Sequence, residues 1–170
     1  MRQSLVAAVV CSTGLLFVVA SGSGTDSGTS AQSRSIVISN GGGELARVPL
    51  SGESFAVSYR NSIYGTYAEE RYAAQPDGSY LLVQIAADQL AVLEEYYAVP
   101  SAPSPADPND RRKWTVDPDP ARPAEFTSLS LAATDLGQRT LHVPGAAPVE
   151  LWKLADSDNP FVVLNLKENQ

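Results

Sequence analysis

The sequence is short of sulfur and of histidine. Its 170 residues contain one cysteine, one methionine and one histidine. The cysteine, Cys11, lies inside an N-terminal apolar run, so a mature chain cut after that run holds no thiol. Disulfides, thiol catalysis and cysteine-bound zinc are therefore excluded for the mature protein, whose fold has to be held together by burial.

Positive charge is scarce as well. The chain has 12 Lys and Arg residues against 19 Asp and Glu residues, which gives a formal net charge of -7. A nucleic-acid partner requires a concentrated basic face, so nucleic acid is not expected as a partner. The same charge disfavours binding to an anionic membrane surface.

The N-terminus has the pattern of an export signal. Arg2 supplies a positive start, residues 5–20 are uncharged and mostly apolar, and small residues follow Ala20. The run is shorter than the roughly 20 residues that span a bilayer. We therefore predict a signal peptide over residues 1–20 that is cleaved near Ala20, with an uncleaved signal anchor as the alternative. The mature protein is then secreted, periplasmic or attached to the cell surface.

The remaining chain divides into a spacer and one domain. Residues 21–35 are rich in Gly, Ser and Thr and poor in apolar side chains, which predicts a flexible spacer. Residues 36–170 are predicted to form a single β-rich domain, because a chain of this length supports one core.

Short alternating or β-branched segments, separated by turn signals, predict about nine or ten strands. The main segments are residues 35–39, 44–50, 55–60, 67–72, 80–86, 126–133, 138–143, 149–154 and 161–167. This spacing predicts an all-β fold, either an antiparallel β-sandwich or a partly closed barrel. Residues 88–99 fit both a helix and a strand, and we favour a strand because the neighbouring segments are strands.

Residues 101–125 are the longest irregular stretch. Prolines at six positions argue against a regular element, and a charged group lies in the middle at residues 110–113. A loop of this length in a small domain is usually a functional lid or a disordered insertion. Trp114 predicts that one point of the loop is attached to the body of the domain.

The stretch FAVSYRNSIYGTYAEERY at residues 55–72 is the densest in functional groups. Its pattern predicts two strands joined by a polar corner, and a break in a well-patterned strand is expected where function or strain overrides packing. The candidate ligand-binding residues are Arg60, Asn61, Ser62, Tyr64, Tyr67 and Glu70. These groups suit a small polar or anionic solute, and the alternative is a tight turn in which Arg60 pairs with Glu70.

The same stretch resembles a family. The run SFAVSYRNSI at residues 54–63, followed by Thr66 and by Glu70-x-Tyr72, is similar to an F-x-x-x-Y-x-x-S core motif of small exported bacterial domains of unknown function. Members are often encoded beside TRAP-type solute transporters, especially those paired with TAXI solute-binding proteins. The resemblance spans roughly residues 36–167. It implies a β-rich extracytoplasmic domain with an accessory role in transport, and it implies no reaction.

This chain departs from the family pattern in three places. Asn61 stands where members commonly carry a histidine. Residues 97–102 replace a glycine-rich segment, and the proline-rich loop looks like an expansion. A family function that needs the histidine is therefore expected to be lost or altered here.

Catalytic and metal-binding patterns are weak. Ser62 with His142 and an aspartate would make a nucleophilic triad, but no G-x-S-x-G elbow surrounds Ser62. His142 alternates with apolar neighbours, which predicts the wetter face of a strand. The aspartates of residues 107–119 lack the spacing of a calcium loop, so no metal or cofactor is expected. Glu69 and Glu70 are adjacent, so they point to opposite faces of a strand.

All tyrosines fall between residues 59 and 97, which predicts cross-strand packing, with a ligand-lining surface as the alternative. Together these features predict a non-enzymatic exported β-domain that binds a partner, such as a membrane transporter, or a small solute. The alternatives are a secreted hydrolase using Ser62 and His142, and a structural surface domain without a ligand pocket.

The export signal makes a direct prediction. N-terminal sequencing of the exported protein is expected to begin near Ser21, because the apolar run is too short and too polar for a stable membrane span. Recovery of a chain with intact Met1 in the membrane fraction would show that residues 5–20 are an anchor.

Overall fold

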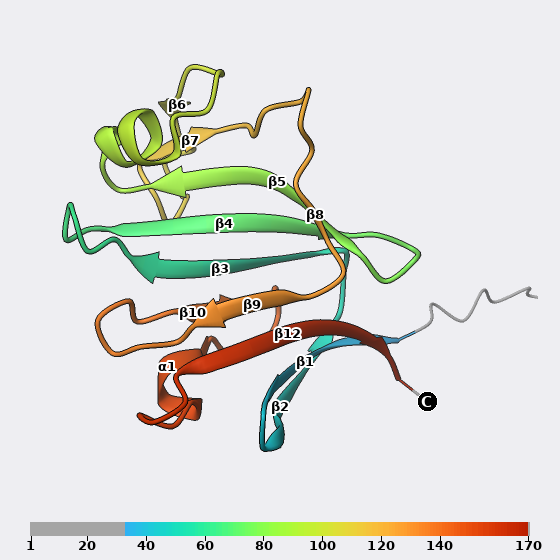
Figure 1. Ribbon diagram of the computed structural model, residues 1–170. Helices are drawn as coiled ribbons and strands as arrows, with labels where there is room; N and C mark the ends of the chain where they lie inside the picture. Colours follow the sequence, from blue (N-terminus) through green and yellow to red (C-terminus); the bar gives the residue numbers. More distant parts are fainter. Residues whose placement is uncertain (1–32, 170) are drawn as a thin grey trace, which may run out of the picture. The chain divides into compact units, whose positions relative to one another are not determined.

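The computed structural model describes residues 33–169 (Figure 1). The predicted signal peptide and residues 21–32 of the predicted spacer lie outside the described residues. Between residues 33 and 169, no helix has the length and apolar character needed to cross a membrane.

Two antiparallel sheets form the fold, which confirms the all-β prediction. The four-stranded sheet has the order β2-β1-β12-β9. Its strands are β1 (Arg34–Asn40), β2 (Gly43–Leu50), β9 (Leu129–Ala132) and β12 (Phe161–Glu168). The predicted hairpin of β1 and β2 is present, and β12 pairs with the other side of β1.

The eight-stranded sheet has the order β11-β10-β3-β4-β5-β7-β6, and β8 also pairs with β5 (Figure 1). The longer strands are β3 (Ser54–Arg60), β4 (Tyr67–Ala74) and β5 (Tyr80–Ala87). The shorter ones are β6 (Ser104–Pro105), β7 (Trp114–Val116), β8 (Glu125–Phe126), β10 (Thr140–His142) and β11 (Val149–Glu150). β7 lies within the proline-rich loop and β8 begins at its end, and the two pair with opposite ends of β5. The loop therefore contacts β5 at two separate places.

The two sheets share one apolar core, because alternation along each strand turns one face inward. Ile38 of β1, Leu164 of β12 and Val57 of β3 are fully buried in this core. Four rings fill the part of the core beneath β3, β4, β5 and β8, with centroids between 5.1 and 6.2 Å apart where they touch. They belong to Phe55, Tyr72, Tyr80 and Phe126.

Residues 88–99 were predicted as a strand, and this prediction is wrong. A π-helix, η1 (Val92–Tyr97), occupies the segment. Val92 and Leu93 are consecutive and both are completely buried, against Ile85 and other residues of the eight-stranded sheet. A strand would point one of the two away from that sheet, whereas a helix lets both contact it. Ala98, at φ 48°, ends the helix.

Two other segments also differ from prediction. Residues 149–154 divide into β11 and a short helix, α1 (Leu151–Leu154), which buries Leu151 in the core. Residues 126–133 divide into the end of β8 and β9, so the chain crosses from one sheet to the other at residues 127–128. The proline-rich loop contains the short strands β6 and β7, and Trp114 of β7 pairs with Ala87, which confirms the predicted attachment.

One buried hydrogen bond joins the two sheets and yields a prediction. The hydroxyl of Tyr80 donates to the carbonyl oxygen of Leu164 at 2.8 Å. Tyr80→Phe is expected to lower the free energy of unfolding by about 1 kcal/mol, measured by urea denaturation, because the carbonyl loses its partner. Tyr96→Phe, on a side chain that is 53% exposed, is the control and should change little. Equal effects of the two substitutions would contradict this role for Tyr80.

Candidate functional site

The predicted polar corner is a hairpin turn. Arg60 and Tyr67 are the last paired residues of β3 and β4, so residues 61–66 close the hairpin as expected. Asn61 is buried, and its Oδ1 accepts hydrogen bonds from the backbone N–H groups of Ile63 (3.0 Å) and Tyr64 (3.2 Å). The side chain of Asn61 therefore builds the turn.

Arg60 does not pair with Glu70, so the alternative of a tight turn held by that pair is wrong. Glu70 accepts hydrogen bonds from the hydroxyls of Tyr72 and Tyr97, both at 2.7 Å. Arg60 is opposite Tyr67 in the register while Glu70 is opposite Val57, so Arg60 and Glu70 point to different faces of the sheet. The Nε of Arg60 instead donates to the carbonyl oxygen of Gly65 at 3.4 Å.

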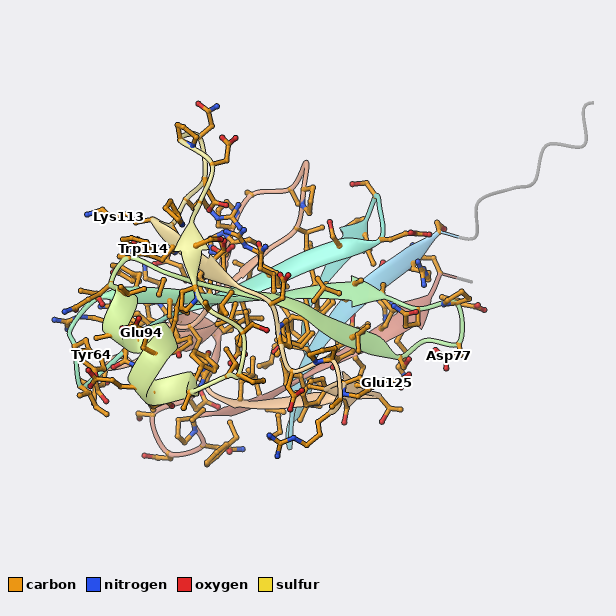
Figure 2. All side chains as sticks on the ribbon, turned by 90° about the horizontal axis from the view of Figure 1, so that it is seen from above. Tyr64, Asp77, Glu94, Lys113, Trp114 and Glu125 are labelled. Carbon is orange, nitrogen blue, oxygen red and sulfur yellow. The ribbon has the colours of Figure 1, made fainter. Side chains whose placement is uncertain are left out.

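Three segments meet at this end of the eight-stranded sheet: the 61–66 turn, η1 and the loop at residues 133–139. The hydroxyl of Tyr64 donates to Glu95 (2.6 Å) and that of Tyr67 donates to Gln138 (3.0 Å). Figure 2 shows Tyr64 and Glu94 of η1 at this end of the domain and Asp77, in the β4–β5 turn, at the other. The predicted residues Tyr64 and Tyr67 thus hold the three segments together.

Arg60, Asn61 and Ser62 line a small pocket of about 210 Å³ between these segments. Arg139, from the loop that precedes β10, also lines this pocket. No sequence pattern identified Arg139 as a site residue. The structure therefore brings together three of the six predicted site residues on one pocket.

A larger pocket of about 710 Å³ lies on the outer face of the eight-stranded sheet, the face that carries Ala56, Arg71 and His142. Most of its walls are apolar. Its lining residues are Ser54, Phe55, Ala56, Arg71, Tyr72, Val83, Gln84, Arg111, His142, Val143, Pro144, Gly145, Ala146 and Pro148. Its volume lies within the roughly 300–1,000 Å³ of typical small-molecule sites, and its few polar groups converge on an apolar cavity, as such sites require.

A β-bulge shapes the wall of the larger pocket. The register of β4 and β5 shifts between Arg71 and Tyr72, which leaves Val83 without an opposite residue. Val83, the unpaired residue of the bulge, and its neighbour Gln84 both line the pocket. The bulge thereby places an apolar wall beside a carboxamide. Val83 is 41% exposed, which is unusual for an apolar residue in the middle of a long strand.

A completely buried carboxylate, Glu69, lies on the same outer face. Its oxygens accept hydrogen bonds from Arg71 (2.9 Å) and from two nitrogens of Arg111 (2.7 and 3.0 Å), and Arg112 lies 3.8 Å away. Arg71 also binds Asp110 with two nitrogens, at 2.6 and 2.8 Å. The charged group of the proline-rich loop is therefore fastened to the sheet at Glu69 and Arg71.

Glu69 and Glu70 do point to opposite faces, as predicted, and so they form no acid–base pair. Burial alone would raise the pKa of Glu69, but the hydrogen bonds from Arg111 and Arg71 outweigh burial and hold that pKa below its ordinary value of 4.5. Glu69 is therefore ionised at neutral pH and binds its arginines as a charged group.

His142 lies on the outer face, as predicted, and lines the larger pocket. Burial lowers the pKa of His142 below 6.5, so its ring is neutral at neutral pH. Its Nε2 shares a hydrogen bond of 2.8 Å with the Oγ of Ser58, whereas Ser62 lines the other pocket. The pairing of Ser62 with His142 is therefore wrong. Ser58 is only 4% exposed and lies in the middle of β3.

The larger pocket escaped prediction because its polar groups come from distant segments. Arg71, Gln84, Arg111 and His142 lie on two strands, the proline-rich loop and β10. The one available signal was the charged group at residues 110–113, which is unusual inside a proline-rich loop. It marks the point where the loop meets a buried charge.

No family model, curated protein or solved structure matches this chain. The resemblance to exported, transporter-associated domains therefore stays a prediction.

The Glu69 cluster predicts a pH-dependent stability. Glu69→Gln is expected to lower the free energy of unfolding by about 3–5 kcal/mol at pH 7, because it removes one partner from a buried ionic cluster. The lowered pKa means that this stabilisation is present above pH 4.5 and is lost as the pH falls through the still lower folded-state pKa. Urea denaturation at pH 7 and at pH 3 should therefore show a smaller difference between variant and wild type at pH 3.

The matched control is Glu44→Gln, which removes an exposed carboxylate from its pair with Arg47. That change should alter the free energy of unfolding by less than about 1 kcal/mol. A Glu69→Gln protein as stable as Glu44→Gln would contradict the importance of the buried cluster.

Proposed function

We propose that this protein is a non-enzymatic, exported binding domain that holds a small organic solute and acts beside a membrane transporter. The observation that carries the proposal is the larger pocket on the outer face of the eight-stranded sheet, with apolar walls and a few polar groups at one side. The export signal and the family resemblance support the location and the transport role.

The lining of the pocket favours a ligand with an apolar body and one polar head. Val83, Ala146 and Pro148 offer hydrocarbon contact. Arg111 is half exposed and uses its Nε and one Nη on Glu69, so its other Nη remains a donor at the pocket. Gln84 and the neutral His142 ring add further hydrogen-bonding groups. A carboxylate or carbonyl head beside Arg111 satisfies these groups.

The ionic cluster favours a rigid site. Arg71, Arg111 and Arg112 carry three positive charges, which Glu69, Asp110 and Asp88 balance. Because this cluster is close to neutral, ligand selection rests on shape and apolar contact more than on charge. A site whose polar groups are already held in place loses little conformational entropy on binding.

The serine that contacts His142 is Ser58, and its position favours a binding role over hydrolysis. A nucleophile has to reach the substrate, and Ser58 is buried and does not line the pocket, although it contacts His142. The hydrogen bond of Ser58 instead orients the imidazole on the pocket wall.

A thermal-shift series tests the pocket. Octanoate, cyclohexanecarboxylate and phenylacetate are expected to raise the melting temperature of the protein, whereas acetate, which lacks an apolar body, is not. A ligand at 100 times its dissociation constant stabilises the folded state by about 2.7 kcal/mol. For a domain of this size that corresponds to a rise of roughly 5–10 °C.

Val83→Glu should abolish this rise, because it places a negative charge on the apolar wall beside the bound acid. The matched control is Ile63→Glu, which makes the same kind of change at an exposed position outside the pocket. No response in the wild-type protein, or an equal response in the two variants, would overturn the proposed site.

A further inference from the structure

Two polar groups of the larger pocket stand side by side. Ser58 of β3 and Glu69 of β4 are directly opposite each other in the register. His142 is hydrogen-bonded to Ser58, and Arg111 is hydrogen-bonded to Glu69. The Cβ atoms of opposite residues in an antiparallel pair are about 5 Å apart. The imidazole and the guanidinium are therefore neighbours where they line the pocket.

The contact with Ser58 determines which nitrogen of His142 carries the hydrogen. Ser58 is 4% exposed, and within residues 33–169 its Oγ forms a hydrogen bond only with the Nε2 of His142. If Nε2 were the donor, the hydroxyl hydrogen of Ser58 would be buried without an acceptor, which is costly. The hydroxyl therefore donates to Nε2, and the neutral ring carries its hydrogen on Nδ1.

Both neighbours keep a donor for a ligand. The Nδ1 of His142 forms no hydrogen bond to a described residue, and it does not belong to the polar atoms that are buried without a partner, so it is open to solvent. Arg111 uses its Nε and one Nη on Glu69 and keeps its other Nη free. Two N–H groups, one from β10 and one from the proline-rich loop, are thus available at the same end of the pocket.

The described lining of the pocket offers donors and no carboxylate. No aspartate or glutamate is among its lining residues, and Arg71 is already bound to Glu69, Gln84 and Asp110. Because Gln84 uses its Oε1 on Arg71, the free group of its carboxamide is Nε2, which is also a donor. The direction of these hydrogen bonds, more than net charge, favours a ligand head that only accepts.

The wall next to His142 is held in place before a ligand binds. Residues 143–148 form a turn in which the backbone N–H of Ala146 donates to the carbonyl oxygen of Val143 at 3.0 Å. The Oγ of Ser51 donates to the carbonyl oxygen of Pro144 at 2.9 Å. An apolar ligand body packed against this turn therefore leaves its head beside the imidazole.

We propose that Arg111 and His142 together form the head-group site of the larger pocket and bind the carboxylate of a monocarboxylic acid. One oxygen accepts from the free Nη of Arg111, and the other accepts from the Nδ1–H of His142. Ser58 is a positioning residue, because it holds the imidazole in the tautomer that donates to the ligand. This inference rests on the binding function proposed for the pocket and adds the chemistry of the head group.

The charged groups around His142 come from three segments. They are Arg111 and Arg112 of the proline-rich loop, Glu69 and Arg71 of β4, and Glu150 of β11, which is paired with Lys153. Residues 143–148 contain no titratable group. Burial, followed by the charge of Arg111, lowers the pKa of His142 below 6.5. A carboxylate bound at Nδ1 favours the charged ring, so binding is expected to tighten as the pH falls.

Nitrogen NMR of the imidazole tests the tautomer, since His142 is the only histidine in the sequence. In the untagged exported protein at pH 7.5 the hydrogen is expected on Nδ1. Ser58→Ala should move part of the population to the Nε2–H tautomer, and Ser58→Thr, which keeps the hydroxyl, should restore the wild-type spectrum. Ser35→Ala removes another buried strand serine with a side-chain hydrogen bond, and as the matched control it should leave the ring unchanged.

Calorimetry with cyclohexanecarboxylate tests the contact with the ligand. From pH 7.5 to pH 6, where the acid stays ionised, the wild-type affinity is expected to rise roughly two- to fivefold. His142→Gln keeps a donor that does not titrate, so its affinity should stay constant over this range. Ser58→Ala should lose affinity in proportion to its loss of the Nδ1–H tautomer. Cyclohexanecarboxamide and cyclohexylmethylamine should bind at least about tenfold more weakly, because each turns N–H groups toward donors.

Three results would overturn the head-group site while leaving the pocket in place. They are a hydrogen on Nε2 in the wild-type protein, equal pH dependence in wild type and His142→Gln, and binding of cyclohexanecarboxamide as tight as that of the acid. The absence of cyclohexanecarboxylate binding in wild type, or binding that Val83→Glu leaves unchanged, would instead overturn the function proposed for the pocket. The two failures are therefore distinguishable.

Discussion

The burial of one carboxylate, Glu69, determines how the outer face of this domain is built. An ionised carboxylate without water is stable only when positive groups and hydrogen bonds surround it. Arg71 comes from the same strand, but the other two arginines have to come from the proline-rich loop. The loop is therefore drawn across the sheet, and in that position Arg111 becomes a wall of the larger pocket. Proline keeps this loop from forming a long helix or strand. The loop is instead held in place by the contact of Arg111 with Glu69 and by the pairing of Trp114 with Ala87.

The next residue along β4, Glu70, organises the opposite face of the sheet through hydrogen bonds with tyrosines instead of ion pairs with arginines. Its carboxylate accepts hydrogen bonds from the hydroxyls of Tyr72 and Tyr97. Burial raises the pKa of both tyrosines far above the ordinary value of 10 and raises the pKa of Tyr59 to about 12, so all three hydroxyls keep their protons and donate. Through Tyr97 and Tyr59, Glu70 holds η1 against the sheet and fixes the ring under Arg139. Two adjacent carboxylates thus support two separate pockets.

The sequence predicts the parts of this structure that depend on local pattern. Alternating or β-branched patterns identified β1 to β5 and β12 within a residue or two. It failed at η1, where consecutive buried residues face a separate apolar cluster, and at the crossing between β8 and β9, where no turn signal separates two short strands. The corner residues were found because they interrupt a pattern. Arg139 and Arg111 were not, because only the tertiary fold brings them to the pockets.

The charge balance of the domain limits how an anion could reach the larger pocket. The net charge of -7 opposes the approach of anions at long range, so an anion is captured only by direct contact within a few ångströms of a guanidinium. The larger pocket lies beside a neutralised ionic cluster, so the ligand proposed for it is expected to be selected by its apolar shape. The absence of long-range attraction lowers the association rate of an anion, so the affinity of the larger pocket for one depends on the contacts made inside the pocket.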